Sequence, residues 1–357
     1  MKCVAVGDIF ITPDMMRAGI ERFDGIVFDR VDYFYFGLDS RSEMRAVVKT
    51  IEIGGFETLA LPEGLVDAVA DADVLMCHLC PVTKTLLDHA PKLKLVLCNR
   101  GGHENVDLAE CTRRDIGVIM NPSHNANAVA EFTVGLMLNE TRNISRACAA
   151  IKAGTWREKY PNTATTIHEM KDFTIGLIGF GAVARLVYEK LQAFGCRFLI
   201  SDPFASQDFV NRNIARFVPL DTLLRESDIV SLHARLSRKA ILLGEKEFAI
   251  MKPTAYFINT ARSYMVDYKD LAAALRSGTI MGAAVDVFDK EPVDPDNPLL
   301  GLDNCTLTNH RGGDTINSYS DSPESMMKAA DEFFEGDRPR YWINPEIKRG
   351  MSSSAMP

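Results

Sequence analysis

Short apolar runs alternate with amphipathic stretches in the first third of the chain, a pattern typical of alternating strands and helices. The apolar runs predict buried strands at Lys2–Val6, Ala72–Cys77, Leu93–Cys98 and Gly117–Met120. Asp107–Asp115, between the last two, has the pattern of a helix. This part of the chain therefore predicts a first, smaller α/β domain.

A second alternation runs from residue 174 to residue 308. It predicts strands at 174–178, Phe198–Ile200, Ile229–Leu232, Ala255–Asn259, Gly282–Val287 and Cys305–Thr308, with helices around 186–191, Lys246–Met251 and Tyr268–Ser277. The repeated βα order favours a parallel, doubly wound sheet with helices on both faces. The expected fold class is therefore α/β, with two doubly wound parallel-sheet domains.

One long amphipathic segment separates the two alternations. Its apolar positions, Val129, Phe132 and Leu136 among them, predict a single helix over Ala128–Ile151. A helix of this length could bridge two domains or support a dimer interface.

Composition narrows the class of protein. With 357 residues the chain is long enough for two domains, and its charge of −8 argues against nucleic acid or an anionic membrane as a partner. No apolar run approaches the roughly 18 residues of a membrane span. The N-terminus resembles a strand rather than a signal peptide because Asp8 interrupts its short apolar run. A cytoplasmic protein is expected.

The eight cysteines lie mostly in apolar stretches, as Cys77, Cys98, Cys148 and Cys196 do. This favours reduced, buried thiols in a cytoplasmic protein. Cys77 and Cys80 have CxxC spacing, but no second pair follows at metal-site spacing. We interpret the pair as a strand end and predict no metal.

A glycine-rich turn lies between the first strand and the first helix of the second alternation. Gly179 would allow a tight turn, Gly181 would let the backbone approach a pyrophosphate, and Ala184 would permit close packing of helix on strand. The N-terminus of the helix offers N–H groups to phosphates. The turn alone is a weak signal, but the strand before it and the helix after it favour nucleotide binding.

An acidic residue completes this fingerprint. Asp202 follows the next strand, about twenty positions after the glycines, where it can accept hydrogen bonds from ribose hydroxyls. Its charge would repel a 2′-phosphate, and the following Pro203-Phe204 provides no arginine to compensate. The predicted cofactor is NAD(H).

Three later strand ends carry residues that can do chemistry. Arg262, Glu291 and His310 each follow a strand of the second alternation, and each alone is equally compatible with an ordinary surface loop. Ligands of parallel sheets bind beyond the carboxyl ends of the strands, so the three together suit reduction of a 2-oxo acid. Arg262 would hold the carboxylate and polarise the C2 carbonyl, and His310 would give the proton. Glu291 would orient and charge the imidazole.

These motifs resemble the D-isomer-specific 2-hydroxyacid dehydrogenase family over nearly the whole chain, with a leaning toward phosphoglycerate and phosphoerythronate dehydrogenases. The matching segments are Ala90–Lys94, Asn105–Asp107, Ala128–Glu131, Gly179–Ala184, Asn259–Arg262, Asp286–Pro292 and His310 with Gly313. The resemblance implies that Arg262, Glu291 and His310 are the catalytic set. Formate dehydrogenases, which look similar, carry a glutamine in place of Glu291.

The resemblance also implies the rest of the architecture. The cofactor-binding set becomes Gly179, Gly181, Ala182, Val183, Asp202, His233, Thr260, Ala261, Asp286 and Gly313, with His233 facing the nicotinamide ribose. The loop Arg100, Gly101 and Gly102 would bind the substrate carboxylate. A Rossmann-type NAD domain, 122–311, would be inserted in a flavodoxin-like substrate-binding domain, 1–121 and 312–357, with the active site in the cleft of a homodimeric enzyme.

Departures from the family pattern concern the substrate. Ser263 replaces a usual glycine, and Asn309, Arg311, Gly312 and Asp314 surround His310 in place of the common residues. Arg100, His103, His124 and Arg311 add positive charge near the expected substrate loops. A sugar acid or its phosphate is one hypothesis, and side chains that only face solvent are the other.

Two rival functions stay open. An NAD-binding regulatory or scaffold protein could share this architecture and even keep the three residues. An NAD-linked reductase of lactones or other carbonyls would not need a carboxylate partner for Arg262.

Overall fold

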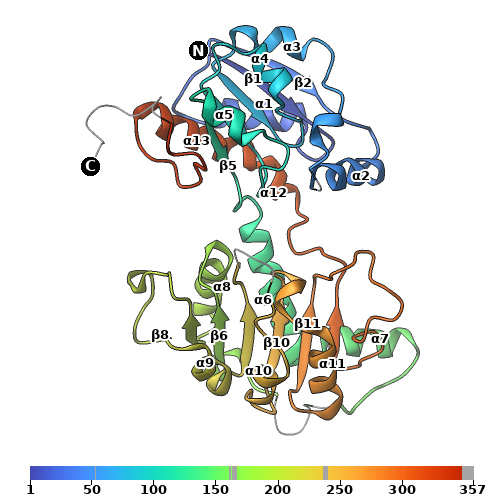
Figure 1. Cartoon of the computed structure of the whole chain (residues 1–357). Coiled ribbons are helices and arrows are strands. Elements are labelled where there is room, and N and C mark those ends of the chain that lie inside the picture. The colour runs from blue at the N-terminus through green and yellow to red at the C-terminus, as the bar shows by residue number, and fades with distance from the viewer. Residues whose placement is uncertain (53, 161, 163–166, 236–239, 348–357) are drawn as a thin grey trace. The chain divides into compact units, whose positions relative to one another are not determined.

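The computed structural model describes residues 1–52, 54–160, 162, 167–235 and 240–347 (Figure 1). It divides into two compact units, which we call unit 1 (Met1–Asn125 with Thr315–Pro357) and unit 2 (Ala126–Asp314). The domains predicted from the sequence have the same arrangement, with 122–311 inserted between 1–121 and 312–357. Residues 348–357 lie outside the described part of the chain. Within the described part, no helix is long and apolar enough to cross a membrane.

Unit 1 contains a parallel sheet of five strands in the order β2-β1-β3-β4-β5. The strands are β1 (Lys2–Gly7), β2 (Arg30–Tyr35), β3 (Val74–Cys77), β4 (Leu95–Cys98) and β5 (Gly117–Met120). Its helices are α1 (Pro13–Arg22), α2 (Arg41–Glu52), α3 (Leu65–Ala68), α4 (Lys84–Asp88), α5 (Leu108–Arg113), α12 (Ile316–Ser320) and α13 (Ser322–Glu335). The four predicted strands are confirmed, and β2 is the one that the apolar pattern missed. This edge strand is only partly buried, so its sequence mixes charged and aromatic residues.

The two edges of this sheet differ. β2 forms one edge, whereas a segment from the end of the chain covers β5 at the other. Trp342 bridges to Ile119 in antiparallel fashion, and the Asn344 side chain accepts a hydrogen bond from Val118 N at 2.8 Å. The last described segment is therefore part of unit 1.

Unit 2 contains a parallel sheet of seven strands in the order β12-β11-β10-β9-β6-β7-β8. The strands are β6 (Thr174–Ile178), β7 (Arg197–Ser201), β8 (Ala215–Phe217), β9 (Ile229–Leu232), β10 (Tyr256–Asn259), β11 (Gly282–Val285) and β12 (Cys305–Leu307). Its helices are α6 (Ala126–Arg142), α7 (Ile144–Lys152), α8 (Ala182–Gln192), α9 (Leu220–Glu226), α10 (Glu245–Ala249) and α11 (Tyr268–Ser277). The α/β class with two parallel sheets is confirmed. The short strand β8 and helix α9 were not predicted.

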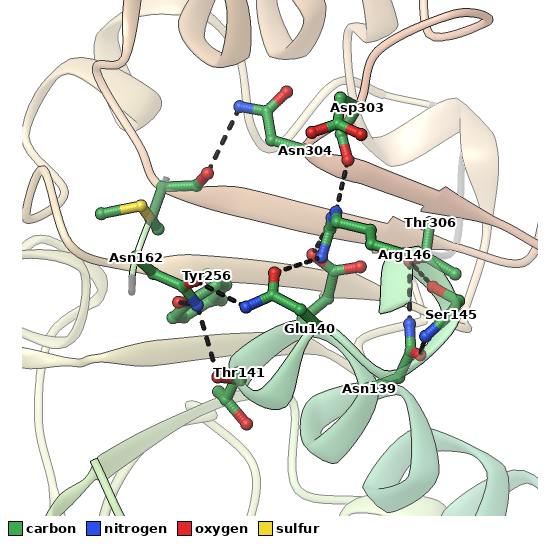
Figure 2. Close-up of polar contacts among 12 residues, drawn as sticks. Asn139, Glu140, Thr141, Ser145, Arg146, Asn162, Tyr256, Asp303, Asn304 and Thr306 are labelled. Carbon is green, nitrogen blue, oxygen red and sulfur yellow. Dashed lines mark hydrogen bonds and ion pairs between the residues drawn. The ribbon is translucent and has the colours of Figure 1, made fainter. Parts of the chain in front are cut away.

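The single long helix predicted over Ala128–Ile151 is wrong, because the chain breaks between α6 and α7. Asn143 adopts a left-handed conformation (φ 55°), which asparagine tolerates better than most residues. Its buried side chain donates to Asn162 Oδ1 at 2.7 Å. In the polar cluster of Figure 2, Asn139 Oδ1 accepts the backbone N–H of Ser145 at 2.8 Å and so satisfies the start of α7.

A buried ion pair spans this break (Figure 2). Arg146 Nη2 lies 2.8 Å from Glu140 Oε2, and the side chains are 8% and 0% exposed. Arg146 also donates to the Asp303 carbonyl. Burial raises the pKa of Glu140, and the Arg146 charge opposes that rise. The cluster includes Tyr256, the first residue of β10, so it lies at the amino ends of the strands of unit 2.

The prediction of buried thiols is confirmed for Cys77, Cys98 and Cys196 and wrong for Cys148. Cys148 is exposed because it lies on α7, none of whose residues is fully buried. Cys77 is the last residue of β3, as the strand-end interpretation of the CxxC pair requires.

Candidate active site

The glycine-rich turn connects β6 to α8 in unit 2. Gly179 has φ +83°, and a Cβ there would lie 2.6 Å from the backbone of Ala234, so only glycine fits. A Cβ on Gly181 would meet open space, and no side chain caps the N-terminus of α8 that begins with Ala182. Ala184 is fully buried against the core. Open space beside uncapped helix N–H groups fits the pyrophosphate of a dinucleotide.

Asp202 holds this turn in place. Its Oδ2 accepts a hydrogen bond from Phe180 N at 2.7 Å, and its Oδ1 accepts one from Phe204 N at 2.8 Å. Each carboxylate oxygen can accept a further hydrogen bond. Asp202, which is predicted to bind the ribose hydroxyls, therefore also supports the backbone of the turn.

His233 follows β9 directly. Its Nε2 lies 2.9 Å from Ser231 Oγ, and burial lowers the pKa of His233 to about 4. The imidazole is therefore neutral near pH 7. A Cβ on Gly179 would also come within 2.9 Å of the His233 carbonyl carbon, so the backbones of the two segments are closely packed.

A buried asparagine shapes the loop that carries Arg262. Asn259, the last residue of β10, accepts from Ala261 N at 3.0 Å and donates to the Arg262 carbonyl at 3.2 Å and to Tyr268 Oη at 3.1 Å. Thr260 Oγ1 lies 2.8 Å from Thr133 Oγ1 of α6. Asn259 was only a motif match in the sequence, although an amide after three apolar strand residues could have indicated this role.

Arg262 itself is exposed. Its only described hydrogen bond is from Nη1 to the neighbouring Ala261 carbonyl at 2.8 Å, and it forms no ion pair with any carboxylate in the described part of the chain. Its guanidinium is therefore available to a carboxylate from solution.

Glu291 and His310 are in direct contact. His310 Nδ1 lies 2.9 and 3.0 Å from the two carboxylate oxygens of Glu291, and Glu291 Oε1 also accepts from Phe288 N at 3.0 Å. The side chain of His310 is 53% exposed, and that of Glu291 is 39% exposed. Since Nδ1 faces the carboxylate, Nε2 is the ring nitrogen left for other partners.

Asp286 fixes the backbone around His310, a role that its assignment to the cofactor had missed. This carboxylate is buried and accepts from Thr308 Oγ1 at 2.6 Å, Arg311 N at 2.9 Å and Gly312 N at 2.9 Å. His310 has φ +55°, an uncommon conformation for a residue with a side chain. The Asp286 hydrogen bonds on both sides of His310 stabilise that conformation.

The remaining predicted residues have fewer partners. Gly313 is half-buried, and the Arg311 guanidinium lies 2.6 Å from Asp314 Oδ2. In unit 1, Arg100 lies 3.5 Å from Glu104, and its buried Nη1 has no hydrogen-bond partner among the described residues. Gly101 is half-buried, and the Gly102 carbonyl accepts from Cys98 Sγ at 3.6 Å.

The chain is similar in sequence to known proteins. Residues 134–312 match the family model described as "D-isomer specific 2-hydroxyacid dehydrogenase, NAD binding domain". A glyoxylate reductase of Thermofilum pendens is 37% identical over 289 residues, which cover 80% of this chain and 85% of that one. A D-3-phosphoglycerate dehydrogenase of Methanocaldococcus jannaschii is 35% identical over 309 residues, covering 84% of this chain and 58% of the relative.

The fold also has solved counterparts. A D-isomer specific 2-hydroxyacid dehydrogenase of Lactobacillus delbrueckii ssp. bulgaricus, in an NAD-complexed form, superposes with a TM-score of 0.73 at 21% identity. The match covers 96% of this chain and 100% of that one. At this identity the likeness extends to the fold alone.

Proposed function

The chain belongs to the D-isomer specific 2-hydroxyacid dehydrogenase family of oxidoreductases, which act on CH–OH donors, and we propose that it interconverts a hydroxylated or phosphorylated 2-oxo acid and its D-2-hydroxy acid. The observation that carries the proposal is the contact between His310 Nδ1 and both oxygens of Glu291. This contact leaves His310 Nε2 as the atom that exchanges a proton with the substrate oxygen.

Each catalytic residue has one task in this proposal. Bound nicotinamide dinucleotide supplies the hydride that C2 receives. His310 donates the proton to the oxygen on C2, and Glu291 orients the ring and stabilises its charged form. Arg262 binds the substrate carboxylate through its planar fork, since no carboxylate of the described chain occupies it.

We assign the cofactor as NAD(H). Ala182, Val183, Thr260, Ala261 and Gly313 would contact it with the glycines of the turn, and Asp202 would take the ribose hydroxyls. The hydrogen bonds that Asp202 accepts from Phe180 N and Phe204 N hold its carboxylate beside the turn, where it would repel a 2′-phosphate. Comparable rates with NADPH and NADH at equal low concentrations would contradict this assignment.

The substrate class rests on Arg100 in unit 1. Its Nη2 pairs with Glu104 at 3.5 Å, and its buried Nη1 has no partner among the described residues, whereas Arg311 is paired with Asp314. The unpartnered Nη1 favours a 2-oxo acid with further polar groups over a plain aliphatic one. We therefore propose 1–121 with 312–357 as the substrate-binding domain and Arg100, Gly101 and Gly102 as its carboxylate loop. Glyoxylate and phosphorylated 2-oxo acids, suggested by the relatives' names, belong in the test panel.

We also propose a homodimer. The apolar side chains of Ile144, Ile151 and Trp156, at and after α7, are 55%, 55% and 80% exposed, which is unusual for a surface that only meets water. A monomer in sedimentation experiments would contradict it.

The proposed function is tested by NADH oxidation with 2-oxo acids. The variant His310→Gln should lose turnover by about a thousandfold, because general acid catalysis contributes on this scale, while NADH binding is unchanged. His89→Gln, at an exposed histidine of unit 1, is the matched control and should keep wild-type rates. A wild-type protein that binds NADH but reduces no 2-oxo acid would favour the regulatory alternative.

A further inference from the structure

One arginine beside the glycine-rich turn of unit 2 has no counter-charge. Arg185 lies near the start of α8, and its Nε donates to the Phe180 carbonyl of the turn at 3.2 Å. Its terminal nitrogens, Nη1 and Nη2, have no hydrogen-bond or ion-pair partner in the described part of the chain. Neither the catalytic residues nor the cofactor-binding residues proposed above include this arginine.

The side chain of Arg185 is directed toward the N-terminus of α8. Long side chains of a helix lean back over the preceding turn, and residues three positions apart lie on the same face. Ala182 is the residue three positions before Arg185, and its methyl group covers little of that face. A Cβ on Gly181 would also meet open space. The guanidinium group therefore reaches the open space where the helix begins.

Two aromatic rings hold the guanidinium group in place. The Cζ atom of Arg185 lies 4.6 Å from the centroid of the Phe209 ring and 5.7 Å from the centroid of the Phe180 ring. The two rings pack edge-on against each other, with centroids 5.9 Å apart, and Phe180 is buried. Such cation–π contacts orient the guanidinium plane and leave the N–H groups at its edge free. The side chain is therefore ordered before any ligand binds, which lowers the entropy cost of binding.

The charges around Arg185 favour an anion. The N-terminus of a helix carries a partial positive charge, so a cation near it is unfavourable unless an anion joins the two. Helix α8 has no acidic residue in its first turn and no side chain that caps its N-terminus. The Asp202 carboxylate already accepts the backbone N–H groups of Phe180 and Phe204. The end of the helix and Arg185 are therefore two positive groups that the described chain leaves without a carboxylate partner.

We propose that Arg185 binds the diphosphate of the dinucleotide through Nη1 and Nη2, in addition to the backbone N–H groups of α8. This inference rests on the proposed cofactor and adds a charged side chain to its site. A planar guanidinium group can donate two parallel hydrogen bonds to phosphate oxygens. The ribose hydroxyls remain with Asp202, so the carboxylate and the arginine bind different parts of the same ligand.

The test measures how ADP and adenosine bind to wild type, Arg185→Met and Arg225→Met, by displacement of bound NADH followed through its fluorescence. ADP carries the diphosphate and adenosine does not. Arg185→Met should raise the dissociation constant of ADP about tenfold, because a charge-assisted hydrogen bond contributes on this scale, and should change that of adenosine less than about twofold. Arg225, an exposed arginine in the last turn of α9, is the matched control and should keep both constants. Thermal unfolding should show that the variants are folded.

The outcomes separate a phosphate contact from a structural role. An equal loss for ADP and adenosine would show that Arg185 only holds the Phe180 carbonyl and the turn, and it would overturn the inference. Unchanged binding of both ligands would overturn it as well, and so would a loss confined to adenosine 2′-phosphate, which would place Arg185 beside the ribose.

Failure of this inference is distinct from failure of the proposed function. A wild-type protein that binds neither NADH nor ADP would overturn the cofactor assignment, and the inference with it. The expected loss of ADP affinity in a protein that reduces no 2-oxo acid would support the role of Arg185 and contradict only the proposed reaction.

Discussion

The two ends of the unit 2 sheet each carry a glutamate paired with a basic residue, an arginine at one end and a histidine at the other, and the pairs differ in burial. Glu140 and Arg146, at the amino ends of the strands, are almost wholly buried (Figure 2). Glu291 and His310, at the carboxyl ends, are about half exposed. A buried ion pair joins parts of the fold, whereas an exposed pair contributes little to stability and is free to meet a ligand.

Each end also has one residue in a left-handed backbone conformation, and the two residues serve different purposes. The left-handed Asn143 beside the buried pair is held by the Asn162 side chain, and the break it makes shapes α6 and α7. The left-handed His310 is held by Asp286 and presents a ring nitrogen outward. The amino end therefore uses its polar residues for the fold, and the carboxyl end uses them to position a reactive group.

The largest effect is expected from Arg146→Met. It removes the cation that pairs with the buried Glu140 carboxylate, which should cost about 3 kcal/mol in the free energy of unfolding. Urea denaturation measures this directly. Arg157→Met is the control, because Arg157 pairs with Asp303 at the surface and should lose less than about 1 kcal/mol. Equal losses in the two variants would contradict the structural role of the buried pair.

A smaller effect is expected from Asp286→Asn. The amide cannot accept both backbone N–H groups of Arg311 and Gly312, so the His310 loop should shift and kcat should fall about tenfold. Steady-state kinetics measure kcat, and NADH titration measures the affinity for the cofactor. If NADH affinity falls while kcat does not, Asp286 serves the cofactor instead of the loop.

The smallest effect concerns pH. The pKa of His233 is lowered to about 4 in the folded protein, against about 6.5 in an unfolded chain. The unfolded state therefore binds more protons between these values, and the protein should lose stability as pH falls from 6.5 toward 4. His233→Gln should show a shallower loss in unfolding experiments at pH 7 and pH 5. A variant as acid-sensitive as the wild type would show that His233 is not the cause.

The sequence predicted the strands that are buried on both faces, because an unbroken apolar run leaves little alternative. It missed β2, since an edge strand can carry charges such as Arg30 and Asp32, and it missed β8, which has only three residues. The break at Asn143 was also missed, because the partner that stabilises it, Asn162, is nineteen positions away.

For the site, the predicted strand ends brought Arg262, Glu291 and His310 to the same sheet edge, and the structure places Glu291 and His310 in contact. The positioning roles of Asn259 and Asp286 could not be predicted, since each depends on which backbone N–H groups turn toward a buried side chain. The contact between His78 Nδ1 and Asp8 Oδ2 in unit 1, at 2.8 Å, could not be predicted for the same reason. The two residues follow strands that are adjacent in the sheet and far apart in the chain.

The most direct test of this contrast makes the same change at both ends and measures kcat and the melting temperature together. Glu140→Gln should lower the melting temperature by several degrees and leave the kcat of the folded protein near the wild-type value. Glu291→Gln should lower kcat by tenfold or more and leave the melting temperature within about a degree. A Glu291→Gln protein that melts early yet turns over normally, or a Glu140→Gln protein that stays stable yet loses turnover, would contradict the account.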